Sequence, residues 1–340
     1  MSSIIGNGKF APPPGGDRNH GIALRDVTIV TFTLALFMST MRLSARVFLV
    51  KKTGWDDWIM TLATSIAAVQ TSFILKCVAS GGGRHQFYLS KEQQLNSTKW
   101  NTLSQIPLVV SNCLIKLSIC FLIIRITNNR QLVKWMWALI GALVLVNGAC
   151  FVNLLAQCRP IQAYWDYSIQ HACWSEKILT DISWLQGVFS IVSDLICTSL
   201  PIVILWNIQI SSKKKFAICG LMALGLFTTA CSIVRMEIYG RTTSFIDSSF
   251  TLTTLEIWSI LEQNIGIIAA NTPVLSPIYV LVRDKTPGLY GSLNTHHAGF
   301  SKLSASKDPD PLDQNGETLQ YPGGDKRGFP LKPLARTGMM

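Results

Sequence analysis

Long apolar stretches separated by short polar segments dominate this chain. One crossing of a bilayer takes about 20 apolar residues. The stretches that reach this length lie at residues 27–50, 56–79, 103–126, 133–157, 183–207, 216–239 and 252–282. None alternates with the period of two that marks a barrel strand, and a helix satisfies its own backbone hydrogen bonds in lipid. The pattern predicts an all-α fold, a bundle of seven transmembrane helices.

The composition points to the same class of protein. Hydrophobic residues make up 49% of the 340 residues and charged residues only 14%, against about a quarter charged in a soluble domain. The net charge is +11, but the basic residues lie between the apolar stretches and form no patch that would follow a phosphate backbone. We expect a multi-pass integral membrane protein whose partner is the lipid bilayer, with no nucleic-acid partner.

Basic residues are concentrated after every second apolar stretch. By the positive-inside rule these segments face the cytoplasm. The N-terminus is therefore expected outside. The residues that carry this expectation are Arg46, Lys51, Lys52, Arg125, Arg130, Lys134, Lys213, Lys214, Lys215, Arg283 and Lys285.

Two features fall in loops that this orientation places outside. The sequon Asn96-Ser97-Thr98 predicts N-glycosylation at Asn96, with an unmodified chance sequon as the alternative. Cys158 and Cys173 are expected to form a disulfide, which would make the loop between them a lid over the bundle. Cys77 also lies near the outer face. The alternative is therefore that Cys158 and Cys173 are not paired with each other.

The chain divides into three parts. Residues 1–26 lack the continuous apolar core of a signal peptide, so they are expected to form an outer N-terminal segment. Residues 27–283 form the seven-helix membrane domain. Residues 284–340 are rich in Pro, Gly, Ser, Lys and Asp and bury too little apolar surface to fold, which predicts a disordered cytoplasmic tail.

Charged residues inside the apolar stretches are the strongest candidates for function, because each is costly in lipid unless it is paired or hydrated. From the outer ends of their helices, Glu262 lies about 15 Å, Asp194 about 16 Å and Lys116 about 20 Å deep, at about 1.5 Å per residue. These three are expected to share one polar layer near the midplane. Arg235 and Glu256 both lie about 6 Å deep and are expected to form a second, shallower pair.

Two interpretations of these charges remain open. In the first, the ion pairs lock the bundle together. In the second, they line a polar pocket that binds a ligand, to which Asn264 and Asn271 add hydrogen-bonding groups. In that pocket Lys116, Asp194 and Glu262 would shift one another's pKa values and hold or pass a proton.

The loop before the third stretch, with the sequence GGGRH, offers further polar groups. Its glycines permit close backbone approach, and Arg84 and His85 supply a cation and a proton carrier that would polarise a ligand oxygen. A flexible turn is the alternative. The chain has no CxxC, HExxH, GxSxG, P-loop or GxGxxG motif. We therefore expect no metal and no cofactor.

Seven short motifs occur in order along residues 27–283. Together they resemble the fungal rhodopsin-like integral membrane proteins, a family with receptor-like members and members encoded in secondary-metabolite gene clusters. The resemblance implies a seven-helix membrane protein. Its motifs are GWDDW at 54–58, GGGRH at 81–85, LIKLSICFLIIRI at 114–126, CRPIQAYWD at 158–166, SDLICTSLPIVILW at 193–206, SIVRM at 232–236 and WSILEQNIGIIAANTPVLSP at 258–277.

Departures from the receptor pattern shape the functional hypotheses. Residues 252–282 contain no lysine for a retinal Schiff base, which argues against a photoreceptor. The third stretch ends in IIRITNN, without the acidic residue expected before its arginine in common receptors. No cysteine-rich outer domain is present in the sequence. These features favour the cluster-associated members of the family.

Three functions remain as hypotheses. The first is a membrane protein of a fungal secondary-metabolite pathway that handles a lipophilic small molecule or changes it by acid/base chemistry; whether it is an enzyme stays open. Its protein partners would be pathway enzymes. The second is a receptor that signals to a cytoplasmic partner through Lys213, Lys214 and Lys215. The third is a transporter or escort, which the lack of a visible internal repeat disfavours.

Overall fold

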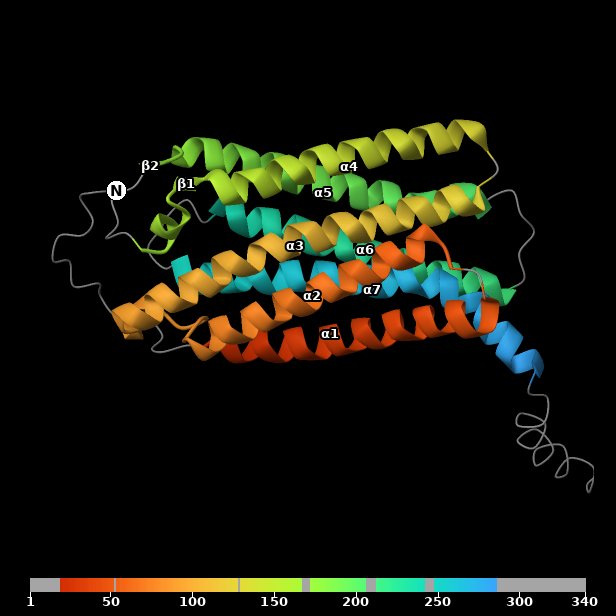
Figure 1. The fold of residues 1–340 in the computed structure, drawn as a ribbon, viewed down its shortest axis with the longest axis horizontal. Coiled ribbons are helices and arrows are strands. Elements are labelled where there is room, and N and C mark those ends of the chain that lie inside the picture. Colours follow the sequence, from red (N-terminus) through yellow and green to blue (C-terminus); the bar gives the residue numbers. More distant parts are fainter. Residues whose placement is uncertain are drawn as a thin grey trace, which may run out of the picture. The chain divides into compact units, whose positions relative to one another are not determined.

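A computed structural model describes residues 19–51, 53–127, 129–166, 172–205, 212–241 and 248–285. Most of the predicted N-terminal segment and nearly all of the predicted tail lie outside these residues. The described part is a bundle of helices that run side by side (Figure 1). The long helices are α1 Gly21–Ser44, α2 Trp55–Ala79, α3 Lys91–Ile126, α4 Arg130–Ala156, α5 Glu176–Leu205, α6 Ser212–Arg241 and α7 Ser248–Lys285.

Short elements connect some of these helices. A π-helical segment, η1 Ala45–Val50, continues α1 to the turn before α2. The 3₁₀ segment η2 Gln86–Tyr88 precedes α3. Between α4 and α5 lie β1 Cys158–Arg159, the 3₁₀ segment η3 Ile161–Tyr164 and β2 Ala172–Cys173.

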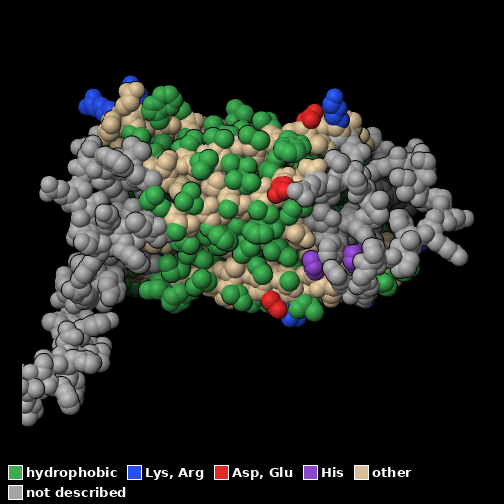
Figure 2. Space-filling view, turned by 180° about the vertical axis from the view of Figure 1, so that it is seen from behind, with side chains coloured by type: hydrophobic (Ala, Val, Ile, Leu, Met, Phe, Trp, Pro, Cys, Tyr) green, Lys and Arg blue, Asp and Glu red, His purple; other side chains and the backbone are tan. Residues whose placement is uncertain are grey.

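The exterior of the bundle is suited to lipid. Within the described residues, six helices are long and apolar enough to cross a membrane, namely α1 with η1, α2, α3, α4, α5 and α6. Large apolar side chains such as Phe48, Leu145 and Leu185 are exposed. On the face in Figure 2, hydrophobic side chains cover much of the middle and few charged side chains are visible. The prediction of an all-α, multi-pass integral membrane protein is confirmed at this level.

Helix α3 begins well before the predicted position at residue 103. Ser90 caps the helix, because its side chain accepts a hydrogen bond from the Gln93 amide at 3.3 Å and Gln93 Oε1 accepts one from the Ser90 amide at 3.0 Å. The first turns are polar, so they carry no apolar pattern that would mark them as part of a membrane-spanning helix. Asn96 therefore lies inside α3, and its predicted position in a loop is wrong.

Small residues hold α1, α2, α3 and α7 close together. The core between them contains Ala35, Ala63, Ala67 and Ala270 with larger apolar partners, and small side chains permit close helix contact in membranes. Hydroxyl groups add hydrogen bonds between these helices. The Ser39 and Thr64 hydroxyls are 3.0 Å apart, and Ser111 Oγ donates to the Ala63 carbonyl at 3.0 Å.

We call the end of the bundle that carries β1 and β2 the hairpin end. Cys158 and Cys173 pair across the two strands and form a disulfide, which confirms the predicted bond. The alternative partner Cys77 is buried in α2, where its Sγ donates to the Ser97 carbonyl.

The glycine loop after α2 packs against the start of α1 at this same end. Gly83 has a φ of +93°, a region that favours glycine. Its carbonyl accepts a hydrogen bond from the His20 amide at 2.9 Å. A Cβ at Gly83 would overlap the backbone of Gly21. The loop is therefore a close helix contact rather than a freely flexible turn.

Candidate functional site

Lys116 is the centre of a buried cluster of charges inside the bundle. It lies on α3 and is 8% exposed. Its Nζ lies 3.0 Å from Oδ1 of Asp194 on α5. The same ammonium group donates to Ser193 Oγ at 2.8 Å, Ser190 Oγ at 3.0 Å and the Ser190 carbonyl at 3.2 Å. One cation is thus surrounded by one carboxylate and three neutral oxygens.

Ser190 joins this ion pair to a second one. Its hydroxyl donates to Oε1 of Glu262 on α7 at 3.0 Å. Oε2 of Glu262 lies 3.2 Å from Nη1 of Arg235 on α6. We call Lys116, Ser190, Asp194, Arg235 and Glu262 the polar layer. It connects α3, α5, α6 and α7 through direct contacts.

The polar layer is electrically balanced, with two cations and two carboxylates. Ser232 Oγ adds a hydrogen bond to Asp194 Oδ2 at 3.2 Å. Burying each ion costs several kcal/mol of hydration, and close pairing and hydrogen bonds offset that cost. Removal of one partner would leave a buried charge without compensation. The structure thus places Lys116, Asp194 and Glu262 in one layer; their roles in catalysis stay predictions.

The predicted pair between Arg235 and Glu256 is wrong, because Arg235 contacts Glu262 instead. Side chains on a helix lean toward its N-terminus. Helix α6 ends at the hairpin end, so Arg235 leans deeper into the bundle. Helix α7 begins there, so Glu256 leans away from Arg235 and Glu262 leans toward it. Side-chain direction, which depth along a helix does not give, therefore decides the partner.

The remaining residues predicted to bind a ligand lie in separate places. Glu256 accepts a hydrogen bond from Ser104 of α3 at 3.2 Å. Asn264 donates to Thr31 of α1 at 2.8 Å. Asn271 lies near the opposite end of the bundle from the hairpin, beside a second group of charges. Glu256, Asn264 and Asn271 therefore form hydrogen bonds with different residues.

Arg84 and His85 lie at the hairpin end, far from the polar layer. His85 is buried, and both residues interact with neighbours. Helix α3 starts after them, and about 37 Å of helix separates Lys91 from Lys116 at about 1.5 Å per residue. Any action of Arg84 or His85 on a ligand would occur at a different depth from Lys116.

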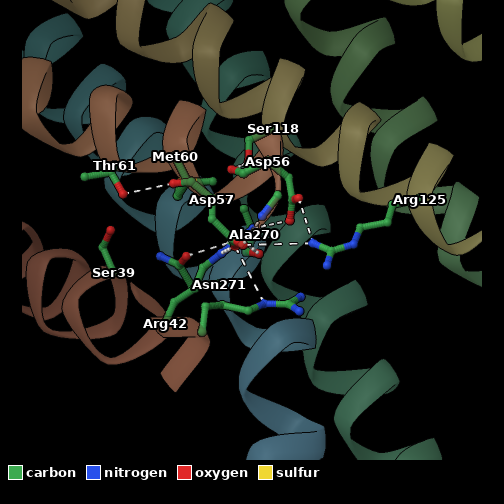
Figure 3. A network of polar contacts seen from close by, with 12 residues as sticks. Ser39, Arg42, Asp56, Asp57, Met60, Thr61, Ser118, Arg125, Ala270 and Asn271 are labelled. Carbon is green, nitrogen blue, oxygen red and sulfur yellow. Dashed lines mark hydrogen bonds and ion pairs between the residues drawn. The ribbon is translucent and has the colours of Figure 1, made fainter. Parts of the chain in front are cut away.

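The second group of charges was not predicted from the sequence (Figure 3). Arg42 of α1 is 2% exposed. Its Nη2 lies 2.8 Å from Asp56 Oδ2 and its Nε lies 2.9 Å from Asp57 Oδ1. Arg125 of α3 reaches Asp56 Oδ1 at 3.1 Å. We call Arg42, Asp56, Asp57, Arg125 and Asn271 the aspartate cluster.

The aspartate cluster ties α1, α2, α3 and α7 together. Arg42 Nη1 donates to the Ala270 carbonyl at 3.0 Å and to Asn271 Oδ1 at 3.5 Å. Ser118 Oγ donates to the Asp56 carbonyl at 2.8 Å. Figure 3 shows Arg42 and Arg125 converging on Asp56. The signal in the sequence was an arginine within the first apolar stretch, followed by the Asp-Asp pair of GWDDW.

The Fungal rhodopsin domain family matches residues 41–281. The chain belongs to this family. The polar layer and the aspartate cluster both lie within the fungal rhodopsin domain. No solved structure matches the chain significantly. In the described residues, no group of three or more His, Cys, Asp or Glu side chains is arranged to hold a metal ion.

Several curated relatives are similar over most of their length. A polyenoic acids biosynthesis gene cluster protein from Metarhizium anisopliae is 25% identical and aligns over 92% of this chain and 91% of its own. Fugralins biosynthesis cluster protein 2 from Gibberella zeae is 23% identical over 82% of this chain and 72% of its own. A SAT4 family membrane protein from Emericella nidulans is 26% identical over 81% of this chain and 67% of its own.

Proposed function

We propose that this fungal rhodopsin domain protein is a membrane component of a secondary-metabolite biosynthetic pathway and that its polar layer binds or converts a lipophilic intermediate. Two kinds of observation support the proposal. Relatives of similar length are named for biosynthetic clusters. The polar layer is the observation that carries the chemical part, because it places ionisable groups of both signs within hydrogen-bonding distance.

The chemistry that such a layer supports is proton transfer. Lys116 and Arg235 stabilise negative charge that develops on an oxygen of the intermediate. Asp194 or Glu262 accepts a proton from it or returns one. The Ser190 hydroxyl accepts from Lys116 and donates to Glu262, so it links the two ion pairs. A non-redox acid/base step, or binding without chemistry, fits these groups.

The proposal includes a topology of seven spans with the N-terminus outside. In this topology the hairpin end faces outward, and Asn96 is available for glycosylation. Arg46, Arg125 and Arg130 lie at the other end, where the positive-inside rule favours basic residues. Treatment of the protein with a glycosidase, compared with an Asn96→Gln variant, tests the outward face. A mobility shift that Asn96→Gln abolishes supports the orientation, and the absence of any glycosidase-sensitive shift in the wild-type protein would count against it.

The central test is the metabolite profile of a deletion strain complemented with variants. We expect deletion to remove one product and to accumulate a precursor or isomer. Wild-type protein should restore the product and Lys116→Ala should not, with both accumulating equally on an immunoblot. The matched control is Lys134→Ala, because Lys134 is exposed on α4 and outside the polar layer. An unchanged profile in the deletion strain would refute the pathway role.

A receptor-like role is the second candidate. The aspartate cluster favours it, because it joins α1, α2, α3 and α7 at the end proposed to face the cytoplasm. A signal passing through the bundle requires such contacts to have two arrangements. Replacement of Lys213, Lys214 and Lys215 with glutamine should then abolish the output and preserve ligand binding. A pathway protein should tolerate that change and lose function on Glu262→Gln.

A further inference from the structure

Glu256 differs from the other buried carboxylates in the described part of the chain. Asp56 and Asp57 pair with Arg42, Asp194 pairs with Lys116, and Glu262 pairs with Arg235. Glu256 is 4% exposed. It has no Lys, Arg or His nitrogen within salt-bridge distance among the described residues. The other titratable side chains that face it are Cys77 and, less closely, Arg235, which is paired with Glu262.

The partners of Glu256 are neutral and contribute oxygen atoms. Ser104 of α3 is fully buried, and its Oγ lies 3.2 Å from Glu256 Oε1. The same hydroxyl lies closer, at 2.7 Å, to the Asn101 carbonyl. Because a hydroxyl has one proton, donation to Asn101 leaves a lone pair of Ser104 directed at the carboxylate. While the proton is directed at Asn101, the Glu256 carboxylate receives no hydrogen bond from Ser104.

Gln70 supplies a second observation at the same place. It lies on α2, is 1% exposed and faces the Glu256 carboxylate. Its amide interacts with the Glu256 carboxylate, but the geometry falls short of a well-aligned hydrogen bond, and its other amide atom has no partner among the described residues. Buried amides are normally satisfied. A bound group between Gln70, Ser104 and Glu256 would satisfy all three residues at once.

The chemistry of these groups selects a hard cation. Carboxylate, hydroxyl and amide oxygens are the ligands preferred by hard metal ions rather than by zinc or copper. A single carboxylate balances a single positive charge. A divalent ion would leave one uncompensated charge among apolar helices, which is costly. The site therefore favours a monovalent ion.

We propose that Glu256, Ser104 and Gln70 bind an alkali-metal cation, with sodium as the probe ion, between α2, α3 and α7. The cation neutralises Glu256 and links three helices in the half of the bundle nearer the hairpin end. This inference is independent of the proposed metabolic function, because none of the three residues belongs to the polar layer.

The experiment measures thermal unfolding of the full-length protein in detergent micelles. The 10 tryptophans provide the fluorescence signal. Sodium chloride is titrated against N-methyl-D-glucamine chloride at equal ionic strength and fixed pH. We expect sodium to raise Tm in a saturable way by about 2–4 °C. The organic cation should not produce this rise, because it is too large to enter.

The variants assign the effect to this site. Glu256→Gln should abolish the sodium-specific rise, whereas the matched change Glu92→Gln, at an exposed position of α3, should preserve it. If Glu256→Gln does not fold, Gln70→Ala and Ser104→Ala should each shift the sodium midpoint about tenfold upward, which equals about 1.4 kcal/mol. Equal effects of both salts, or a sodium effect that survives in these variants, would overturn the proposal. A Tm that varies with pH and not with sodium would show that Glu256 holds a proton instead.

Discussion

Lys116 of α3 and Asp194 of α5 form a buried ion pair, with Nζ 3.0 Å from Oδ1. The pair joins two helices that are not neighbours in sequence. Each charge compensates the other at a depth where neither is well hydrated. The two ions therefore act as a unit, and loss of either one is more harmful than loss of both.

A double-mutant cycle measures this coupling. We expect Lys116→Met or Asp194→Leu alone to destabilise the protein by about 3–5 kcal/mol, because the remaining ion is buried without its partner. The double variant Lys116→Met, Asp194→Leu should recover much of this loss. The measurement is Tm in detergent. If the losses of the two single variants simply add in the double variant, the pair is not coupled.

Substitution of two serines on α5 distinguishes the hydrogen bonds to Lys116 from the link between the two ion pairs. Ser190→Ala and Ser193→Ala each remove one hydrogen bond to Lys116, at an expected cost of about 1 kcal/mol. Only Ser190 also contacts Glu262. If the link between the pairs matters for the proposed acid/base step, Ser190→Ala loses the metabolite in the complementation assay and Ser193→Ala retains it. Equal retention by both variants would exclude a role for the link.

Arg42 should be the most sensitive position of the aspartate cluster. Its guanidinium contacts Asp56, Asp57 and the Ala270 carbonyl. We expect Arg42→Met to cost about 3–5 kcal/mol, because both carboxylates lose their fully buried cation. The matched control is Arg25→Met, because Arg25 is exposed in the same helix and such pairs contribute about 0–1 kcal/mol. Similar unfolding temperatures for the two variants would contradict the assignment.

The Cys158–Cys173 disulfide closes a loop with a sequence separation of 15 residues. In the chain-entropy model, such a crosslink stabilises the folded state by about 3 kcal/mol, because it restricts the unfolded chain. We expect the variant Cys158→Ser, Cys173→Ser to unfold at a lower temperature than wild type. A reducing agent should lower the Tm of wild type and leave the double variant unchanged. A reductant effect that persists in the variant would point to a different bond.

The sequence predicted Lys116, Asp194 and Glu262 as members of one polar layer because a charge in lipid is costly unless it is paired. It did not predict the partner of Arg235, since helix direction determines where a long side chain leans. Arg42 was missed as well, because one arginine near the end of an apolar stretch looks like a residue at the membrane surface.

The start of α3 shows a different limit. Ser90 and Gln93 form a cap that is visible in sequence, but the polar turns that follow carry no apolar signal. The apolar pattern therefore predicts a start at residue 103, whereas the helix begins at Lys91. Local capping determines this boundary, while hydrophobicity determines only which part of α3 contacts lipid.

The length of α3 has a further consequence for how a molecule reaches the polar layer. With 36 residues, α3 is about 54 Å long, whereas the hydrocarbon core of a bilayer is about 30 Å thick. Its first turns are polar, and Lys116 lies in the apolar part of the helix that is long enough to cross a bilayer. Under the proposed function, a lipophilic intermediate dissolved among the acyl chains would already lie at the depth of the polar layer, without crossing the headgroup region.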